Sequence, residues 1–151
     1  VSTAGVDADS AGFINKFGVK LAVSLHFPNE DLRSQLMPVN KTFSLSKLVK
    51  ELRKINLGKR EYITIEYIMI DGVNDQIDHA KQLINLLGML KIKFNLIPYN
   101  PTQTFRAEPS SDAQINKFAS YLSSKNFMVT VRRSRGVDVE GGCGQFSLKR
   151  A

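Results

Sequence analysis

Short apolar segments alternate with amphipathic ones along most of this chain, and this alternation constrains the fold more than any other feature. Residues 20–27, 62–70, 92–98 and 127–133 are mostly apolar or β-branched and have the length of β-strands. Between them lie segments whose apolar residues recur every three or four positions, as on one face of a helix. Strands that alternate with helices predict an α/β fold, in which right-handed crossover helices join the parallel strands.

Helix starts are the clearest local signals. Ser44 is a predicted N-cap before one apolar helical face, and Ser111 stands three residues before Gln114, which is the spacing of a capping box. A further helix is predicted to follow Asn74 and Asp75. The strand at 62–70 is apolar on both of its alternating faces apart from two residues, which predicts burial between two layers.

Polar residues follow several of the predicted strands. Ligands of parallel sheets bind at the carboxyl ends of the strands, so polar residues at this edge are the candidates for a binding or catalytic site. They are Ser24 and His26 after the first strand, Asp71, Asn74 and Asp75 after the second, Asn95, Tyr99 and Asn100 at the third, and residues 135–145 after the last.

Composition narrows the class of protein. The 151 residues, 42% of them hydrophobic, predict one globular domain. No apolar run reaches the roughly 18 residues of a membrane span, and residues 1–10 do not resemble a signal peptide. We therefore expect a cytoplasmic protein without a membrane partner. The single cysteine excludes an internal disulfide framework and cannot hold a metal centre by itself.

The net charge is +7, from 21 Lys and Arg against 14 Asp and Glu, which favours a polyanionic partner. Residues 126–151 contribute to the excess, with five basic residues against two acidic ones. Among them, Arg132, Arg133 and Arg135 precede the cysteine. Charge alone leaves open a solvated basic edge that binds nothing.

Cys143, the only cysteine, lies in the segment VEGGCGQF at 139–146, where three glycines flank it. Glycines permit positive φ angles and let another molecule approach the backbone closely. The nearby arginines favour the thiolate, which is the nucleophilic form. The segment therefore predicts a reactive loop cysteine, and the alternative is an incidental thiol in a flexible tail.

Other candidates have ordinary structural alternatives. His26 is either a ligand group or a residue that binds the backbone at a strand end, and Glu66 is either a ligand group or a partner for a buried Lys or Arg. His79 is predicted to be an ordinary surface histidine on the polar side of its helix. Asn100 precedes a proline, and this pair of residues is also common in turns.

Four ordered segments, LAVSLHFPNEDLRSQLMPVNK, YITIEYIMIDGVND, FNLIPYNP and VTVRRSRG with a later CGQ, resemble the RlmN-type radical S-adenosylmethionine (SAM) methyltransferases of bacteria. This resemblance implies the C-terminal part of a partial (β/α) barrel, with residues 1–151 as one portion of the radical SAM domain. It also implies methylation of carbon 2 of adenine in large-subunit ribosomal RNA and in transfer RNA.

The family motifs imply a role for individual residues. Cys143 in CGQ would carry the methyl group, and Ser24, Leu25 and His26 of SLH, Asn100 of IPxNP and Ser2 of VSTAG would contact S-adenosylmethionine. The basic residues Arg132, Arg133 and Arg135 would face RNA phosphates. A four-iron four-sulfur cluster and an electron donor protein such as flavodoxin also follow from the family.

The chain departs from the family in lacking the CxxxCxxC motif that holds the cluster. We expect a longer active protein of which these residues are one part, with this chain alone inactive. The alternatives are a non-catalytic RNA- or cofactor-binding relic of the fold, and an enzyme of the antibiotic-resistance type that methylates carbon 8 of adenine.

Overall fold

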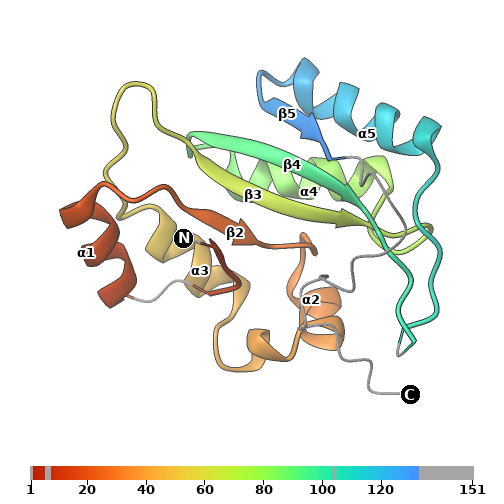
Figure 1. Ribbon diagram of the computed structural model, residues 1–151, viewed down its shortest axis with the longest axis horizontal. Helices are drawn as coiled ribbons and strands as arrows, with labels where there is room; N and C mark the ends of the chain where they lie inside the picture. Colours follow the sequence, from red (N-terminus) through yellow and green to blue (C-terminus); the bar gives the residue numbers. More distant parts are fainter. Residues whose placement is uncertain (1, 6–7, 104, 133–151) are drawn as a thin grey trace.

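The computed structural model describes residues 2–5, 8–103 and 105–132 (Figure 1). Five parallel strands form one sheet, and their order across the sheet is their order along the chain. The strands are β1 (Ser2–Thr3), β2 (Ala22–Ser24), β3 (Ile63–Met69), β4 (Ile92–Pro98) and β5 (Met128–Val131). The predicted α/β architecture with crossover helices is confirmed.

Four helices alternate with the strands and pack against one face of the sheet. They are α1 (Ala8–Phe17), α3 (Leu45–Leu52), α4 (Ile77–Leu87) and α5 (Asp112–Ser124). Their apolar faces share one core with alternate residues of the strands, such as Ile65 of β3 and Phe94 of β4, both with no exposed surface. No helix in the described part of the chain has the length and apolar character needed to cross a lipid bilayer.

Among the described residues, no helix layer covers the opposite face of the sheet. We expected the strand at 62–70 to be buried between two layers, but Thr64 and Glu66 are only half-buried on this face, whereas Ile63 and Ile65 are completely buried under the helices. The same alternation continues in β4, where Asn95 is half-buried. We call this surface the open face, and it corresponds to the inside of a partial barrel.

Near the carboxyl ends of the strands, a second apolar cluster covers part of the open face. It includes Ile68 of β3 with Phe27, Tyr99 and Phe105 from the connecting segments. The ring of Tyr99 meets Phe105 edge-on, and its hydroxyl donates a hydrogen bond of 2.9 Å to the Phe105 carbonyl oxygen. The short α2 (Glu30–Leu36) and the 3-10 helix η1 (Pro38–Lys41) follow β2 at this end.

Both predicted N-caps are confirmed, but the capping box predicted for Ser111 and Gln114 is not formed, and the Gln114 side chain donates instead to the Asp75 carbonyl oxygen. The Ser44 hydroxyl accepts a hydrogen bond from the Lys47 amide at the start of α3, and the Ser111 hydroxyl accepts one from the Gln114 amide at the start of α5.

The prediction for His79 is wrong. Its ring is half-buried, and Nδ1 accepts a hydrogen bond of 3.1 Å from the amide of Gln76, the N-cap of α4. Burial lowers the pKa of His79, against the opposing effects of Asp75 and Asp78. His79 therefore closes a capping box, a role that a Gln and a His three residues apart did not suggest.

Candidate functional site

Ser24, Leu25 and His26 end β2 and begin the loop to α2, at the carboxyl end of the sheet. All three are buried. The Ser24 hydroxyl donates to the carboxylate of Glu66 on the open face over 3.2 Å, and the Leu25 amide donates to the Glu66 carbonyl oxygen over 3.1 Å. Glu66 thus partners a serine, and the salt bridges of the described residues include none between Glu66 and a Lys or Arg.

His26 has an unusual backbone. Its φ angle is 58°, in the left-handed region that residues other than glycine seldom adopt. This conformation ends β2 at Ser24, so the strand is shorter than the predicted segment 20–27. A strained residue of this kind persists only where its surroundings hold it in place, and such residues cluster at functional sites.

The His26 ring is neutral at physiological pH. Burial and, to a smaller extent, the nearby Arg33 charge lower its pKa to about 3, against the opposing effect of a backbone hydrogen bond with Glu66. Nδ1 accepts a hydrogen bond of 3.2 Å from the Ile68 amide, so the ring proton lies on Nε2. His26 therefore binds the backbone at a strand end, which was one of its two predicted roles. This hydrogen bond also fixes the tautomer of the ring.

Asn74 holds the His26 loop against the end of β3. Its amide nitrogen donates to the carbonyl oxygens of His26, at 2.8 Å, and Ile68, at 2.5 Å, and its side-chain oxygen accepts from the Ile70 amide at 2.8 Å. The Asn74 carbonyl oxygen accepts a further bond from the Tyr67 hydroxyl. Asn74 is completely buried, so its side chain serves the backbone and does not face a ligand.

Arg33 of α2 holds the loop from the other side and has no exposed surface. Its guanidinium donates to backbone carbonyl oxygens after two strands, Ala4 at 2.7 Å and Leu25 at 3.4 Å, and to the Phe43 carbonyl oxygen at 3.2 Å. It also donates to the side-chain oxygen of Asn40 at 2.6 Å. Sequence reasoning missed Arg33, because its acceptors are mostly backbone atoms distant along the chain.

Asn40 connects this arginine to a carboxylate. Its amide nitrogen donates to Glu30 Oε2 at 2.8 Å and to the Ser34 hydroxyl at 2.6 Å. The other oxygen of Glu30 accepts from the Ser46 amide at 2.9 Å. The buried positive charge is therefore compensated through an amide and a polar network, and no direct ion pair with Arg33 is among the salt bridges of the described residues.

The remaining predicted cofactor contacts lie at different levels of the sheet. Ser2 is exposed and pairs with Ala22, two residues before Ser24, so it lies further from the carboxyl end. Asn100 is exposed just beyond β4, at the carboxyl end. The structure thus groups Ser24, Leu25 and His26, whereas Ser2 lies on β1 and Asn100 lies just beyond β4, two strands away from β2.

Of the predicted RNA-binding residues, Arg132 is exposed after β5, where its amide donates to the Leu96 carbonyl oxygen. Arg133, Arg135 and the methyl-carrying candidate Cys143 lie outside the described residues.

Asp75, another candidate from the strand ends, closes the loop before α4. Its carboxylate accepts hydrogen bonds from the Ser110 hydroxyl at 2.8 Å, the Gln76 side chain at 2.8 Å and the Gly72 amide at 3.2 Å. Asp75 is completely buried, and its oxygens are used within the protein. Its role is to hold the loop in place.

The two cofactors implied by the resemblance fit this chain differently. The carboxyl half of the sheet carries the hydroxyl of Ser24, the neutral imidazole of His26 and, just beyond β4, the exposed amide of Asn100, which are groups that suit the polar ribose and amino acid parts of S-adenosylmethionine. A four-iron four-sulfur cluster needs cysteine ligands. The chain has one cysteine, and the described residues contain no group of three His, Cys, Asp or Glu that could hold a metal ion. The cluster does not fit the residues present here.

Sequence comparison identifies close relatives of the chain. It is 42% identical over 149 residues to the dual-specificity RNA methyltransferase RlmN of Psychrobacter arcticus, covering 96% of this chain and 36% of the relative. It is 40% identical to RlmN of Campylobacter lari, covering 100% of this chain and 43% of the relative. The chain thus spans about two fifths of the length of these curated relatives. No family model matches the sequence.

Solved structures agree with this result. A radical SAM methyltransferase from Sphaerobacter thermophilus superposes with a TM-score of 0.82 at 42% identity, covering 96% of this chain and 43% of that one. A domain of pyruvate-formate lyase-activating enzyme from Bacteroides vulgatus, 13% identical, shares the fold with a TM-score of 0.60 over 88% of this chain and 98% of that one. Over the part of the fold that it spans, the chain is similar in sequence and in structure to the RlmN-type radical SAM methyltransferases.

Proposed function

We propose that this chain supplies the cofactor-holding edge and the methyl-carrying cysteine of an RNA methyltransferase that acts on carbon 2 of adenine in large-subunit ribosomal RNA and in transfer RNA. The observation that carries the proposal is the buried Ser24–His26 segment, held in a strained conformation with a neutral imidazole at the carboxyl end of the sheet. The names of the relatives support RNA as the substrate class.

The predicted cofactor residues have different roles in this proposal. The hydroxyls of Ser2 and Ser24 and the amide of Asn100 bind the polar parts of S-adenosylmethionine, together with the neutral ring of His26. Leu25 does not contact the cofactor in this proposal, because its side chain is buried and both its amide and its carbonyl oxygen are hydrogen-bonded within the protein. It positions its two neighbours.

S-adenosylmethionine, when bound, supplies a methyl group on a sulfonium. In the proposed first step the Cys143 thiolate attacks that methyl carbon, so a carbon–sulfur bond to Cys143 forms as the sulfonium–methyl bond breaks. Arg132, Arg133 and Arg135 stabilise the thiolate and the RNA phosphates. We assign no step to the iron–sulfur cluster, since no group among the described residues could hold a metal ion, and none to an electron donor such as flavodoxin.

Peptide mass spectrometry of the complete polypeptide, prepared anaerobically with its cluster and supplied with S-adenosylmethionine, tests the carrier role. We expect one added methyl on the peptide that contains Cys143 and none in the Cys143→Ala variant. Nucleoside analysis of RNA from the same reactions should then show adenine methylated at carbon 2. An unmodified Cys143 in loaded protein contradicts the proposal, and methylation at carbon 8 would correct its regiochemistry.

A further inference from the structure

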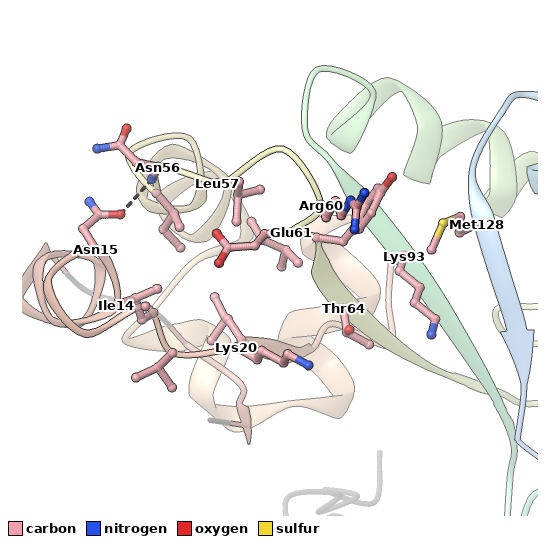
Figure 2. Close-up of a pocket in the computed structure, with 16 residues that line it drawn as sticks. Ile14, Asn15, Lys20, Asn56, Leu57, Arg60, Glu61, Thr64, Lys93 and Met128 are labelled. Atoms are coloured by element: carbon pink, nitrogen blue, oxygen red, sulfur yellow. Dashed lines mark hydrogen bonds between the residues drawn. The ribbon is translucent and has the colours of Figure 1, made fainter.

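A second candidate site lies at the opposite end of the strands from the cofactor residues. A cavity of about 540 Å³ opens there between the segment before β2, the segment before β3 and the start of the open face. Figure 2 shows Lys20, Arg60 and Lys93 around it, with Thr64 of β3 between Lys20 and Lys93. Its volume is within the range of small-ligand sites in proteins.

Positive charge predominates around this amino-end cavity. Three cations line it, Lys20, Arg60 and Lys93, against the single carboxylate of Glu61. That carboxylate accepts a hydrogen bond of 2.7 Å from the Gly58 amide, and in Figure 2 it is turned toward Leu57, away from Lys93 and Met128. The side of the cavity at the start of the open face is therefore cationic.

The surroundings of the cavity extend the positive charge. In a parallel sheet, the connections that lead from a helix into the next strand all lie at this end. Here basic residues lie in or next to each of the connections α1–β2, α3–β3, α4–β4 and α5–β5. The exposed ones are Lys16, Lys20, Arg53, Lys54, Lys59, Arg60, Lys91 and Lys125. Of these, Lys54 pairs with Glu51.

An aromatic ring accompanies these cations. Tyr62, just before β3, lines the cavity and is 41% exposed. Asn15 and Asn56 add polar groups, and the Asn15 side chain accepts a hydrogen bond of 2.7 Å from the Asn56 amide. Cations beside an exposed ring are the combination by which proteins bind single-stranded nucleic acid, with phosphates paired and a base stacked.

We propose that the amino-end cavity binds a nucleotide of single-stranded RNA, with Lys20, Arg60 and Lys93 neutralising phosphate and Tyr62 stacking on a base. This inference rests on the proposed function, because it takes the same substrate class. The seven residues of β4 separate the cavity from the carboxyl end by roughly 20 Å. The cavity therefore contacts a part of the RNA remote from the reacting adenine and contributes affinity.

Fluorescence anisotropy with a labelled single-stranded RNA of about 12 nucleotides tests the site on the complete polypeptide. The variant combines Lys20→Ala, Arg60→Ala and Lys93→Ala. Raising the salt from about 50 to about 200 mM should weaken RNA binding by the native protein roughly 20-fold more than binding by this variant, because about three phosphate contacts are lost. Tyr62→Leu should weaken binding about fivefold or more at either salt concentration.

Matched controls separate the cavity from general charge. Lys47→Ala, Lys50→Ala and Lys117→Ala together remove the same charge from exposed helix positions outside the cavity, and Phe13→Leu removes an exposed ring of α1. These controls should keep most of the native affinity and salt dependence. Equal losses in both triple variants, or unchanged binding in the cavity variant, would overturn the site.

Methylation of Cys143 by S-adenosylmethionine, measured without RNA, distinguishes this inference from the proposed function. We expect the cavity variants to retain that modification at the native level. If the cavity variants keep both Cys143 methylation and native RNA binding, only the inference about the cavity is refuted. If Cys143 is not methylated in the native protein, the proposed function is refuted.

Discussion

The two ends of the sheet differ in how their polar residues are held. At the carboxyl end, Arg33, Asn74 and His26 are buried and joined by hydrogen bonds to the backbone. At the amino end, Lys20 and Arg60 are exposed around a cavity. A site that must orient a small cofactor needs fixed groups, whereas a flexible polyanion is bound by exposed charges that tolerate several arrangements. The comparison predicts that substitutions at the first end change stability and that substitutions at the second end change binding.

The largest effect is expected from Arg33→Met. The change leaves the carbonyl oxygens of Ala4, Leu25 and Phe43 without their donor in a buried region, which should lower the free energy of unfolding by about 3–5 kcal/mol. Urea unfolding followed by circular dichroism measures it. Arg53→Met, at an exposed position after α3, is the control and should change stability little. A loss below about 1 kcal/mol in Arg33→Met would contradict a structural role for the network.

A pH effect is expected at His26. Because its pKa falls from 6.5 to about 3 on folding, the unfolded chain takes up a proton on this residue below about pH 6.5 while the folded protein does not. Stability from His26 is thus present above that pH and is lost at roughly 1.4 kcal/mol per pH unit as the pH falls toward 3. Denaturant titrations of native protein and His26→Asn between pH 7 and pH 4 should differ by this slope. Parallel curves would show that the ring is protonated in the folded state.

Asn74→Ala should lower the free energy of unfolding by about 2–3 kcal/mol, because two carbonyl oxygens and one amide lose their partner. Hydrogen exchange should accelerate most at the Ile70 amide, which donates to Asn74. Asn116→Ala, at an exposed position of α5, provides the comparison. Unchanged exchange at Ile70 would mean that another group holds the end of β3.

The smallest effect is expected at the amino end. Arg60→Ala should change the free energy of unfolding by less than about 0.5 kcal/mol, since the side chain is exposed. Thermal unfolding followed by differential scanning calorimetry measures it at low salt. A loss comparable to that of Asn74→Ala would place Arg60 in the structural framework and remove the difference between the two ends.

Local sequence signals predicted most of the elements. The strand at 92–98 has the predicted bounds, and Ser44 and Ser111 cap their helices as expected. These features depend on neighbouring residues, so a single sequence contains them. The early end of β2 could not be predicted, because the left-handed conformation of His26 depends on Asn74, which is 48 residues away along the chain.

The candidate site was predicted in part. Ser24 and His26 lie at the carboxyl end of the sheet as expected from topology, and their binding to a cofactor stays a prediction. Arg33 was missed because an arginine in a polar segment ordinarily lies on the surface. Its carbonyl acceptors come from separate segments and lie close to Arg33 only in the folded chain. The positive charge at the amino end was also missed, because the loops that carry it are widely separated in sequence and meet only through the parallel topology.

The order of the strands also bears on how the chain folds. Each strand pairs with the strand of the preceding unit, so every new strand and helix can add to a surface that already exists. Contacts of this kind link units that are near in sequence, which lowers the entropy lost in closing loops. The arrangement favours assembly unit by unit from one edge to the other, as in repeat proteins. A growing chain could therefore build its sheet in the order in which it is synthesised.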